Sequence, residues 1–113
     1  MKIMVAGAGG FIGGHLVKKL ELEGHQVTAV DIKPIEDWFQ LTLNSKANIA
    51  DLRVKDYALV FTIGIDQIYN LACDMGGMGF IENNKAKCME SVLINTHLLQ
   101  AARDNEVGKF FFS

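Results

Sequence analysis

Three glycines near the N-terminus have a spacing that suits the binding of a phosphate-containing ligand. Gly7, Gly10 and Gly13 form a GxxGxxG pattern within the segment GAGGFIG. The first glycine permits a tight turn after a strand, the second lets the backbone approach a pyrophosphate closely, and the third lets a helix pack against the sheet. The free N–H groups at the start of that helix stabilise phosphate charge. The pattern predicts a dinucleotide-binding turn, with a glycine turn that holds no ligand as the alternative.

An acidic residue follows at the distance that a dinucleotide-binding unit requires. Asp31 ends the next apolar segment and lies 18 positions after Gly13. A carboxylate at the end of the second strand accepts hydrogen bonds from the hydroxyls of the adenosine ribose. It also repels a 2′-phosphate and so favours NAD over NADP, a preference that the nearby Lys33 weakens. The expected cofactor is therefore NAD.

A second carboxylate, Asp51, ends the third apolar segment and directly precedes Leu52. Because the carboxyl ends of parallel strands line the ligand crevice, Asp51 is placed to accept from the adenine amino group. An N-cap for the helix predicted at residues 54–62 explains Asp51 equally well. The two roles are compatible.

The segments around these residues alternate between strand and helix patterns. Helices are predicted at residues 11–23, 54–62 and about 82–105, with one or two helical turns near 36–41. Short apolar runs predict strands at residues 2–6, 26–30, 47–50, 67–73 and 109–112. This order predicts an α/β fold, a Rossmann-type doubly wound parallel sheet of about five strands with helices on both faces.

Glycines and apolar residues give further expectations for the helices. Gly24 and Gly108 are expected to end the first and the last helix. Trp38 lies seven residues after Asp31, where it would either border the adenine or anchor the core. The long last helix is expected to bury a stripe at helical spacing, formed by Met89, Val92, Leu93, Thr96 and Leu99.

Composition narrows the classes of partner. The chain has 113 residues, enough for one domain, and a formal net charge of −2 without a run of like charges. This balance gives no reason to expect nucleic acid or an anionic membrane as partner. Two cysteines without a CxxC spacing form neither a disulfide framework nor a zinc motif. No segment reaches the roughly 20 apolar residues that span a bilayer, so a cytoplasmic protein is expected.

The motifs together resemble a known superfamily. The segment VAGAGGFIGGHL, then Asp31, Asp51-Leu52 and the triplet Asn70-Leu71-Ala72, resembles the extended short-chain dehydrogenase/reductase superfamily of NAD-dependent nucleotide-sugar epimerases and dehydratases. Within it, residues 70–81 (NLACDMGGMGFI) resemble the GDP-mannose 3,5-epimerase family. The resemblance runs over the whole chain but covers only the first third of such an enzyme. It implies a partial NAD-binding domain at residues 1–113, without the catalytic and sugar-binding parts.

The resemblance also implies roles for individual residues. Asp31 would bind the ribose, Asp51 and Leu52 would flank the adenine, and Leu71 and Ala72 would run beneath the cofactor. Gly76, in the DMGGMG loop, would contact the GDP-sugar of a complete enzyme. The pyrophosphate contacts would come from the glycine turn, that is from Gly7, Gly10, Phe11 and Ile12, with Gly13 in the same motif.

The superfamily's catalytic Tyr-x-x-x-Lys pair is missing from this chain. Tyr57 is followed four residues later by Phe61, and Tyr69 by Cys73. The general base that would start hydride transfer is therefore missing, so we expect cofactor binding without turnover. Two alternatives stay open: a non-enzymatic dinucleotide-binding or sensing module that acts through a partner, and a truncated product with no function of its own.

Two further expectations concern the second half of the chain. Spacing within the long helix puts Ser91 where the superfamily often has an asparagine, with Asn95 one turn later, and neither is assigned a catalytic role. Phe110, Phe111 and Phe112 form an aromatic final strand. Left uncovered, such a strand is expected to cause self-association.

Overall fold

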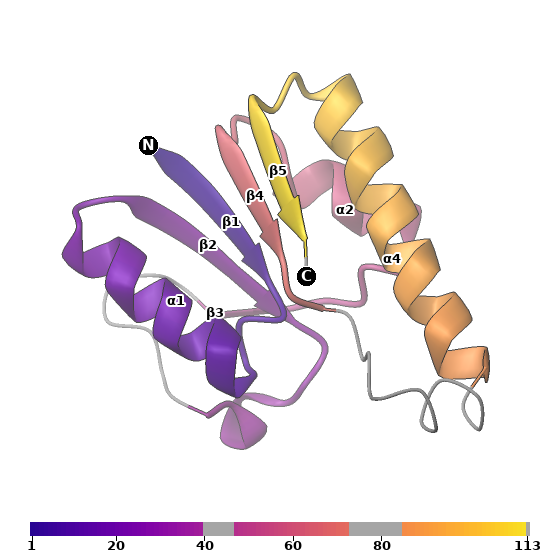
Figure 1. Cartoon of the computed structure of the whole chain (residues 1–113), viewed down its shortest axis with the longest axis horizontal. Helices are drawn as coiled ribbons and strands as arrows, with labels where there is room; N and C mark the ends of the chain where they lie inside the picture. Colours follow the sequence, from indigo (N-terminus) through magenta and orange to yellow (C-terminus); the bar gives the residue numbers. More distant parts are fainter. Residues whose placement is uncertain (40–46, 73–84, 113) are drawn as a thin grey trace.

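The computed structural model describes residues 1–39, 47–72 and 85–112, with the backbone alone for residues 85–88. Its strands are β1 (Lys2–Ala6), β2 (Gln26–Asp31), β3 (Ala47–Ile49), β4 (Gln67–Asn70) and β5 (Lys109–Phe112). All neighbours pair in parallel, in the order β3-β2-β1-β4-β5 (Figure 1). The chain reverses its direction of winding between β1 and β4, and this switch point is where doubly wound sheets bind ligands. The predicted fold is confirmed, although β4 ends at Asn70 rather than at Cys73, which lies outside the described residues.

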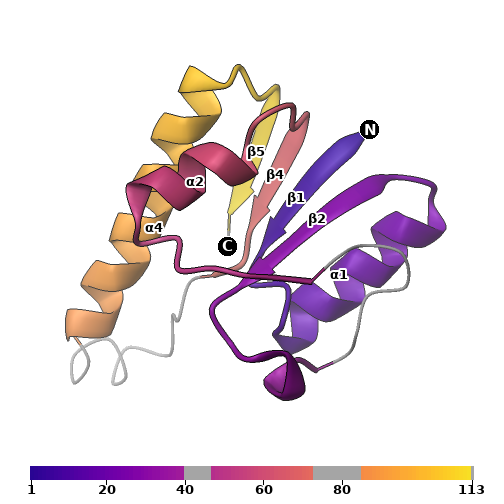
Figure 2. The same cartoon turned by 180° about the vertical axis from the view of Figure 1, so that it is seen from behind.

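Helices cover both faces of the sheet. The helix α1 (Phe11–Leu22) lies on one face, and α2 (Lys55–Phe61) and α4 (Lys85–Asp104) lie together on the other (Figures 1 and 2). Between β2 and β3, where one or two helical turns were expected, the chain forms the short 3₁₀ helix η1 (Ile35–Asp37). None of the helices in the described ranges is both long enough and apolar enough to cross a membrane.

The central strand β1 shows why the N-terminal sequence is apolar at consecutive positions. Ile3 and Val5 belong to the core beneath α1, whereas Met4 and Ala6 belong to the core beneath α2 and α4. All four side chains are at most 1% exposed. A strand covered on both faces has no position for a polar side chain, so the usual alternation of polar and apolar residues is lost.

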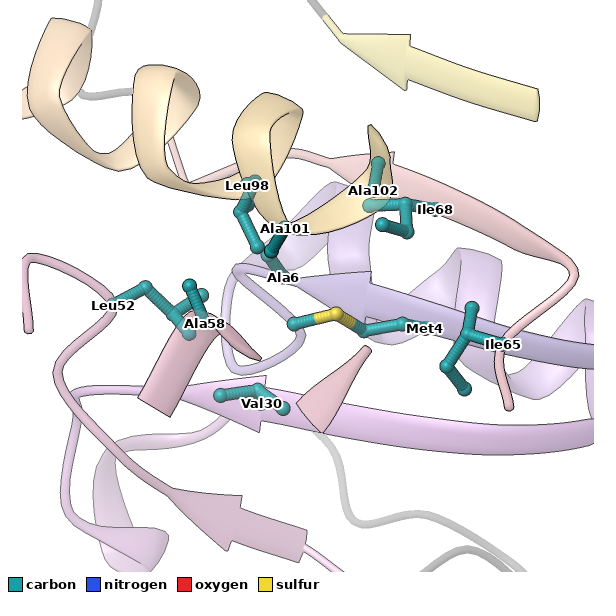
Figure 3. Close-up of a cluster of buried hydrophobic side chains, with 10 residues drawn as sticks. All are labelled: Met4, Ala6, Val30, Leu52, Ala58, Ile65, Ile68, Leu98, Ala101 and Ala102. Carbon is teal, nitrogen blue, oxygen red and sulfur yellow. The ribbon is translucent and has the colours of Figure 1, made fainter. Parts of the chain in front are cut away.

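Two hydrophobic clusters therefore stabilise the domain, one on each face of the sheet. Figure 3 shows Leu98 and Ala101 of α4 directed toward Ala6 on β1. The full cluster on that face contains Met4, Ala6, Val30, Leu52, Ala58, Ile65, Ile68, Leu98, Ala101 and Ala102.

On the α1 face, Trp38 is a buried member of the second cluster, and its Nε1 donates to the Lys33 carbonyl at 2.9 Å. Of the two roles considered for Trp38, core anchoring is the one that it has.

The predicted buried stripe of α4 is wrong. Met89 is 67% exposed and Leu99 is 43% exposed, and Val92, Leu93 and Thr96 are exposed as well. The buried face instead carries Ser91, Leu98, Ala101 and Ala102, with Ile94 half-buried. The two faces have the same spacing, and two of the residues on the buried face are small alanines. The pattern of larger side chains therefore pointed to the opposite face.

Helix ends follow the prediction at α1 but not at α4. Gly24 has φ +89°, and the N–H of His25 donates to the Leu20 carbonyl at 3.1 Å, as in a Schellman motif. At the end of α4, Glu106 has φ +57°, and Gly108 instead donates its N–H to the Asp66 carbonyl at 3.0 Å. Gly108 thus joins β5 to the sheet, and Glu106 instead adopts the left-handed conformation that follows α4.

The packing of α4 can be tested with two adjacent leucines. Leu98→Ala should lower the free energy of unfolding by about 2–5 kcal/mol, because Leu98 is fully buried and its removal leaves a cavity. Leu99→Ala should cost less than about 1 kcal/mol, because that side chain is exposed. Urea denaturation of both variants measures the difference, and equal losses would contradict the assignment of the buried face.

Candidate functional site

The glycine turn after β1 is held by contacts that leave no room for a side chain at Gly7. Gly7 has φ +80°, and its N–H donates to the Val30 carbonyl at 2.9 Å. A Cβ atom on Gly7 would lie 2.6 Å from the carbonyl group of Leu71, which follows β4. Both the backbone conformation and the close approach of β4 therefore require glycine at this position.

The other two glycines of the pattern differ in what they contact. A Cβ on Gly13 would lie 2.1 Å from the Gly7 carbonyl oxygen, so this glycine allows α1 to begin directly against the turn. A Cβ on Gly10 would meet nothing closer than that same oxygen, at 3.5 Å. The fold thus requires Gly7 and Gly13, as predicted, whereas it would tolerate a side chain at Gly10.

Gly9 is a further glycine that the packing of the turn requires and that the sequence pattern missed. A Cβ there would lie 2.9 Å from the Trp38 ring and 3.0 Å from Oδ2 of Asp31. The Gly9 N–H donates to that oxygen at 2.9 Å. The one signal in the sequence is the pair of adjacent glycines, Gly9 and Gly10, in which the first lies outside the GxxGxxG spacing.

Asp31 joins the end of β2 to the glycine turn. Its Oδ2 accepts from Gly9, and its Oδ1 accepts from the backbone N–H of Lys33 at 3.0 Å. The residue is only 9% exposed. An ionised carboxylate has about four acceptor positions, so acceptor capacity remains beyond these two bonds.

A cavity of about 580 Å³ lies at the carboxyl ends of the strands, within the size range of small-molecule sites. Charged side chains from three segments border it, among them Lys33, Arg53 and Glu90. Most of the predicted binding residues line this cavity, namely Gly7, Gly10, Asp31, Asp51, Leu52, Leu71 and Ala72.

Phe11 and Ile12, predicted as pyrophosphate contacts, do not line the cavity and are 60% and 69% exposed. Gly13 is buried behind the turn, and Gly76 lies outside the described residues.

Asp51 is not the N-cap of α2. The N-cap position is Val54, and no side-chain hydrogen bond caps the helix. The Asp51 carboxylate instead pairs with Arg53, whose Nη2 lies 2.8 Å from Oδ2. Hydrogen bonds from the Arg53 side chain lower the pKa of Asp51 below its ordinary value, despite partial burial. Asp51 is therefore an ionised acceptor at neutral pH.

Arg53 is a second site residue that sequence analysis missed. Besides Asp51, it contacts Glu90 on α4, with Nη1 and Oε1 3.0 Å apart. Its pKa is raised by the hydrogen bond to Asp51 and by the charges of Asp51 and Glu90. An arginine two residues after a strand-end aspartate was the available signal, but the partner on α4 comes from tertiary structure.

A pair of asparagine side chains, one buried and one half-buried, fixes the end of β4. Asn70 is fully buried, and its Nδ2 donates to Oδ1 of Asn95 at 3.1 Å. Its own Oδ1 accepts from the N–H of Ala72 at 3.1 Å. Asn95 thus ties α4 to β4, and the pair orients the backbone of Leu71 and Ala72 along the cavity wall.

Metal chemistry has no candidate within the ranges that the structure describes. No group of three or more histidine, cysteine, aspartate or glutamate side chains is placed there to hold an ion. The polar groups around the cavity are backbone amides, carboxylates and cations, which suit the phosphates and hydroxyls of a nucleotide.

Fold and cavity together define a dinucleotide-binding α/β domain, and comparison with known proteins gives its family. Residues 3–113 match the model of the NAD dependent epimerase/dehydratase family, and the chain belongs to this family. The predicted superfamily is thereby confirmed, and so is the dependence of its family on NAD.

The names of individual relatives and similar structures refer to nucleotide sugars. GDP-mannose 3,5-epimerase 1 of Oryza sativa subsp. japonica is 42% identical over 114 residues, which cover 100% of this chain and 30% of that protein. MoeE5 in complex with UDP-glucuronic acid and NAD is 26% identical, with a TM-score of 0.85, covering 99% of this chain and 36% of that one. UDP-glucose 4-epimerase of Thermotoga maritima shares the fold at 23% identity, with a TM-score of 0.85 and coverage of 99% and 37%. The chain thus spans about a third of the length of these relatives.

The roles of the glycines can be separated by two substitutions. Gly13→Ala should lower the free energy of unfolding by about 3 kcal/mol or more, because the new Cβ clashes with the Gly7 carbonyl. Gly10→Ala, the matched control, should cost about 1 kcal/mol or less. Thermal and urea denaturation test this order, and a Gly10→Ala variant less stable than Gly13→Ala would contradict it.

Proposed function

We propose that this chain binds NAD in the cavity at the carboxyl ends of β1, β2 and β4. The main support is that the Gly7–Gly10 turn and the Asp31 carboxylate border the same cavity and are hydrogen-bonded to each other. The family's dependence on NAD supports the choice of ligand. Asp31 favours NAD over NADP because a 2′-phosphate would meet a carboxylate.

The pyrophosphate would lie against the start of α1. The N-cap, Gly10, carries no side chain that could cap the helix, and Gly14 is the first residue whose N–H bonds back to it, at 2.8 Å. The N–H groups of the first turn are therefore available to phosphate oxygens. On this proposal Phe11 and Ile12 act through their backbone, which agrees with the outward direction of their side chains.

The adenosine would occupy the other end of the cavity. Asp31 would accept from the ribose hydroxyls and Asp51 from the adenine amino group. Leu52 is 4% exposed and anchors its segment in the core, so its backbone would hold the base near Asp51. Leu71 and Ala72 would run beneath the cofactor.

For a longer protein that contains this chain, we propose epimerase chemistry on a GDP-sugar. The proposal rests on the similarity to the rice protein, which is named GDP-mannose 3,5-epimerase 1. The contact between Gly76 and the sugar stays a prediction. These 113 residues hold no Tyr-x-x-x-Lys pair, so we expect them to bind NAD without turnover. A non-enzymatic binding or sensing module is the second candidate, and a reading frame that continues past Ser113 would remove it.

Calorimetric titration with NAD and NADP tests the proposed site. The wild-type chain should bind NAD about tenfold or more tightly than NADP, because Asp31 repels the extra phosphate. Asp31→Asn should narrow that difference, since it removes the charge but keeps an acceptor. Asp37→Asn, at an exposed position on η1, should behave as wild type. A folded chain that binds neither dinucleotide would overturn the proposal.

We also propose that the outer strand β5 promotes self-association of the 113-residue chain. Phe111 stacks on Tyr69 with ring centroids 4.7 Å apart, but it is still 43% exposed, and Phe112 is 65% exposed. Exposed aromatic side chains on an edge strand favour pairing with another copy.

Sedimentation velocity over a range of concentrations tests this second proposal. Phe112→Lys should shift the chain toward monomer, because a lysine on an edge strand opposes pairing. Val60→Lys, at an exposed apolar position of α2, should leave the distribution unchanged. A wild-type chain that is monomeric throughout would contradict the proposal.

A further inference from the structure

We infer that Arg53 is a positioning residue that fixes the Asp51 carboxylate toward the purine base and so selects a base with a 6-amino group. The inference rests on the proposed binding of NAD and deepens it. It assigns to the chain a determinant of base specificity that lies outside the glycine motif.

The contacts between Arg53 and Asp51 hold the carboxylate from two directions. The backbone N–H of Arg53 donates to Oδ1 at 2.9 Å. Its Nε lies 2.9 Å from Oδ1 and 3.1 Å from Oδ2, and its Nη2 lies 2.8 Å from Oδ2. A planar guanidinium in this bidentate arrangement fixes the plane of the carboxylate, which a lysine would not do.

These contacts use most of the acceptor capacity of Asp51. Of about four acceptor positions on a carboxylate, the backbone N–H and Nε take the two on Oδ1, and Nη2 takes one on Oδ2. Within the part of the chain that the structure describes, one acceptor position on Oδ2 remains, apart from the longer contact that Nε makes with this oxygen. A single N–H donor satisfies it, as the amino group at C6 of adenine would. A carbonyl at C6, as in hypoxanthine, would place one acceptor against another.

The guanidinium is itself anchored to a second segment that borders the cavity. Its Nη1 lies 3.0 Å from Oε1 of Glu90 on α4, whereas Asp51 follows β3. Arg53 therefore spans two elements that border the site. The other charged residues lining the cavity, Asp31 and Lys33, come from the end of β2. The low pKa of Asp51 keeps its carboxyl an acceptor only, so it cannot donate to a base carbonyl instead.

Calorimetric titration with NAD and with nicotinamide hypoxanthine dinucleotide tests the inference. The wild-type chain should prefer NAD by about tenfold or more, the factor that a hydrogen bond to a charged group supplies. Arg53→Met should lose this preference, mainly through weaker binding of NAD. Arg53→Lys should keep part of this preference, because a lysine keeps the positive charge but lacks the planar guanidinium that makes the bidentate contact. Arg103→Met is the matched control, since Arg103 is exposed and pairs with Asp104, and it should match wild type.

A second readout separates positioning from a loss of structure. Titration of the Asp51 carboxyl carbon by NMR should show a higher pKa in Arg53→Met than in wild type, while circular dichroism stays unchanged. Should Arg53→Met fail to fold, Arg53→Lys carries the comparison. A wild-type chain that binds neither dinucleotide overturns the proposed function and this inference with it. A chain that binds both equally, or an Arg53→Met variant that keeps the full preference, overturns the role of Arg53 alone.

Discussion

The close approach of three backbone segments governs this domain. The turn after β1 passes so near the end of β4 and the start of α1 that Cβ atoms on Gly7 and Gly13 would lie 2.6 Å and 2.1 Å from backbone atoms. Helix, turn and sheet therefore have one mutual arrangement. The two hydrophobic clusters stabilise that arrangement from both faces of the sheet. The cavity at the switch point is a consequence, because the strands on either side of it wind in opposite directions.

Two carboxylates, Asp31 and Asp51, border the same cavity as the glycine turn. Asp31 accepts a hydrogen bond from Gly9 of the turn, and Asp51 is paired with Arg53, so contacts within the protein fix both acceptors. Fixed acceptors lower the ordering cost of binding, since fewer side chains must be immobilised when the ligand arrives. In the proposed site, contacts within residues 1–53 therefore preorganise the adenosine end, and Glu90 adds one contact from α4.

Local patterns predicted the fold class and the succession of strands and helices along the chain. The glycine turn and the position of Asp31 at the end of β2 follow from spacing, because each reflects a pattern within a short stretch of sequence. The buried face of α4 was assigned wrongly, since two faces have the same periodicity and only the sheet decides between them. Gly9 and Arg53 were missed for a related reason. The partners of Gly9 are Asp31 and Trp38, and Arg53 reaches Glu90, so both roles depend on contacts distant in sequence.

We propose above all that the glycine turn and the carboxyl ends of the strands form the NAD site. Backbone amide chemical shifts, followed by NMR during titration with NAD, test it most directly. We expect saturable shifts at Gly7, Gly10 and Asp31, with Gly24 and Gly64 unchanged, because those two glycines lie at the other end of the sheet beside Met1 and Lys2. Saturable shifts confined to Gly24 and Gly64, or no shifts from a folded chain, would contradict it.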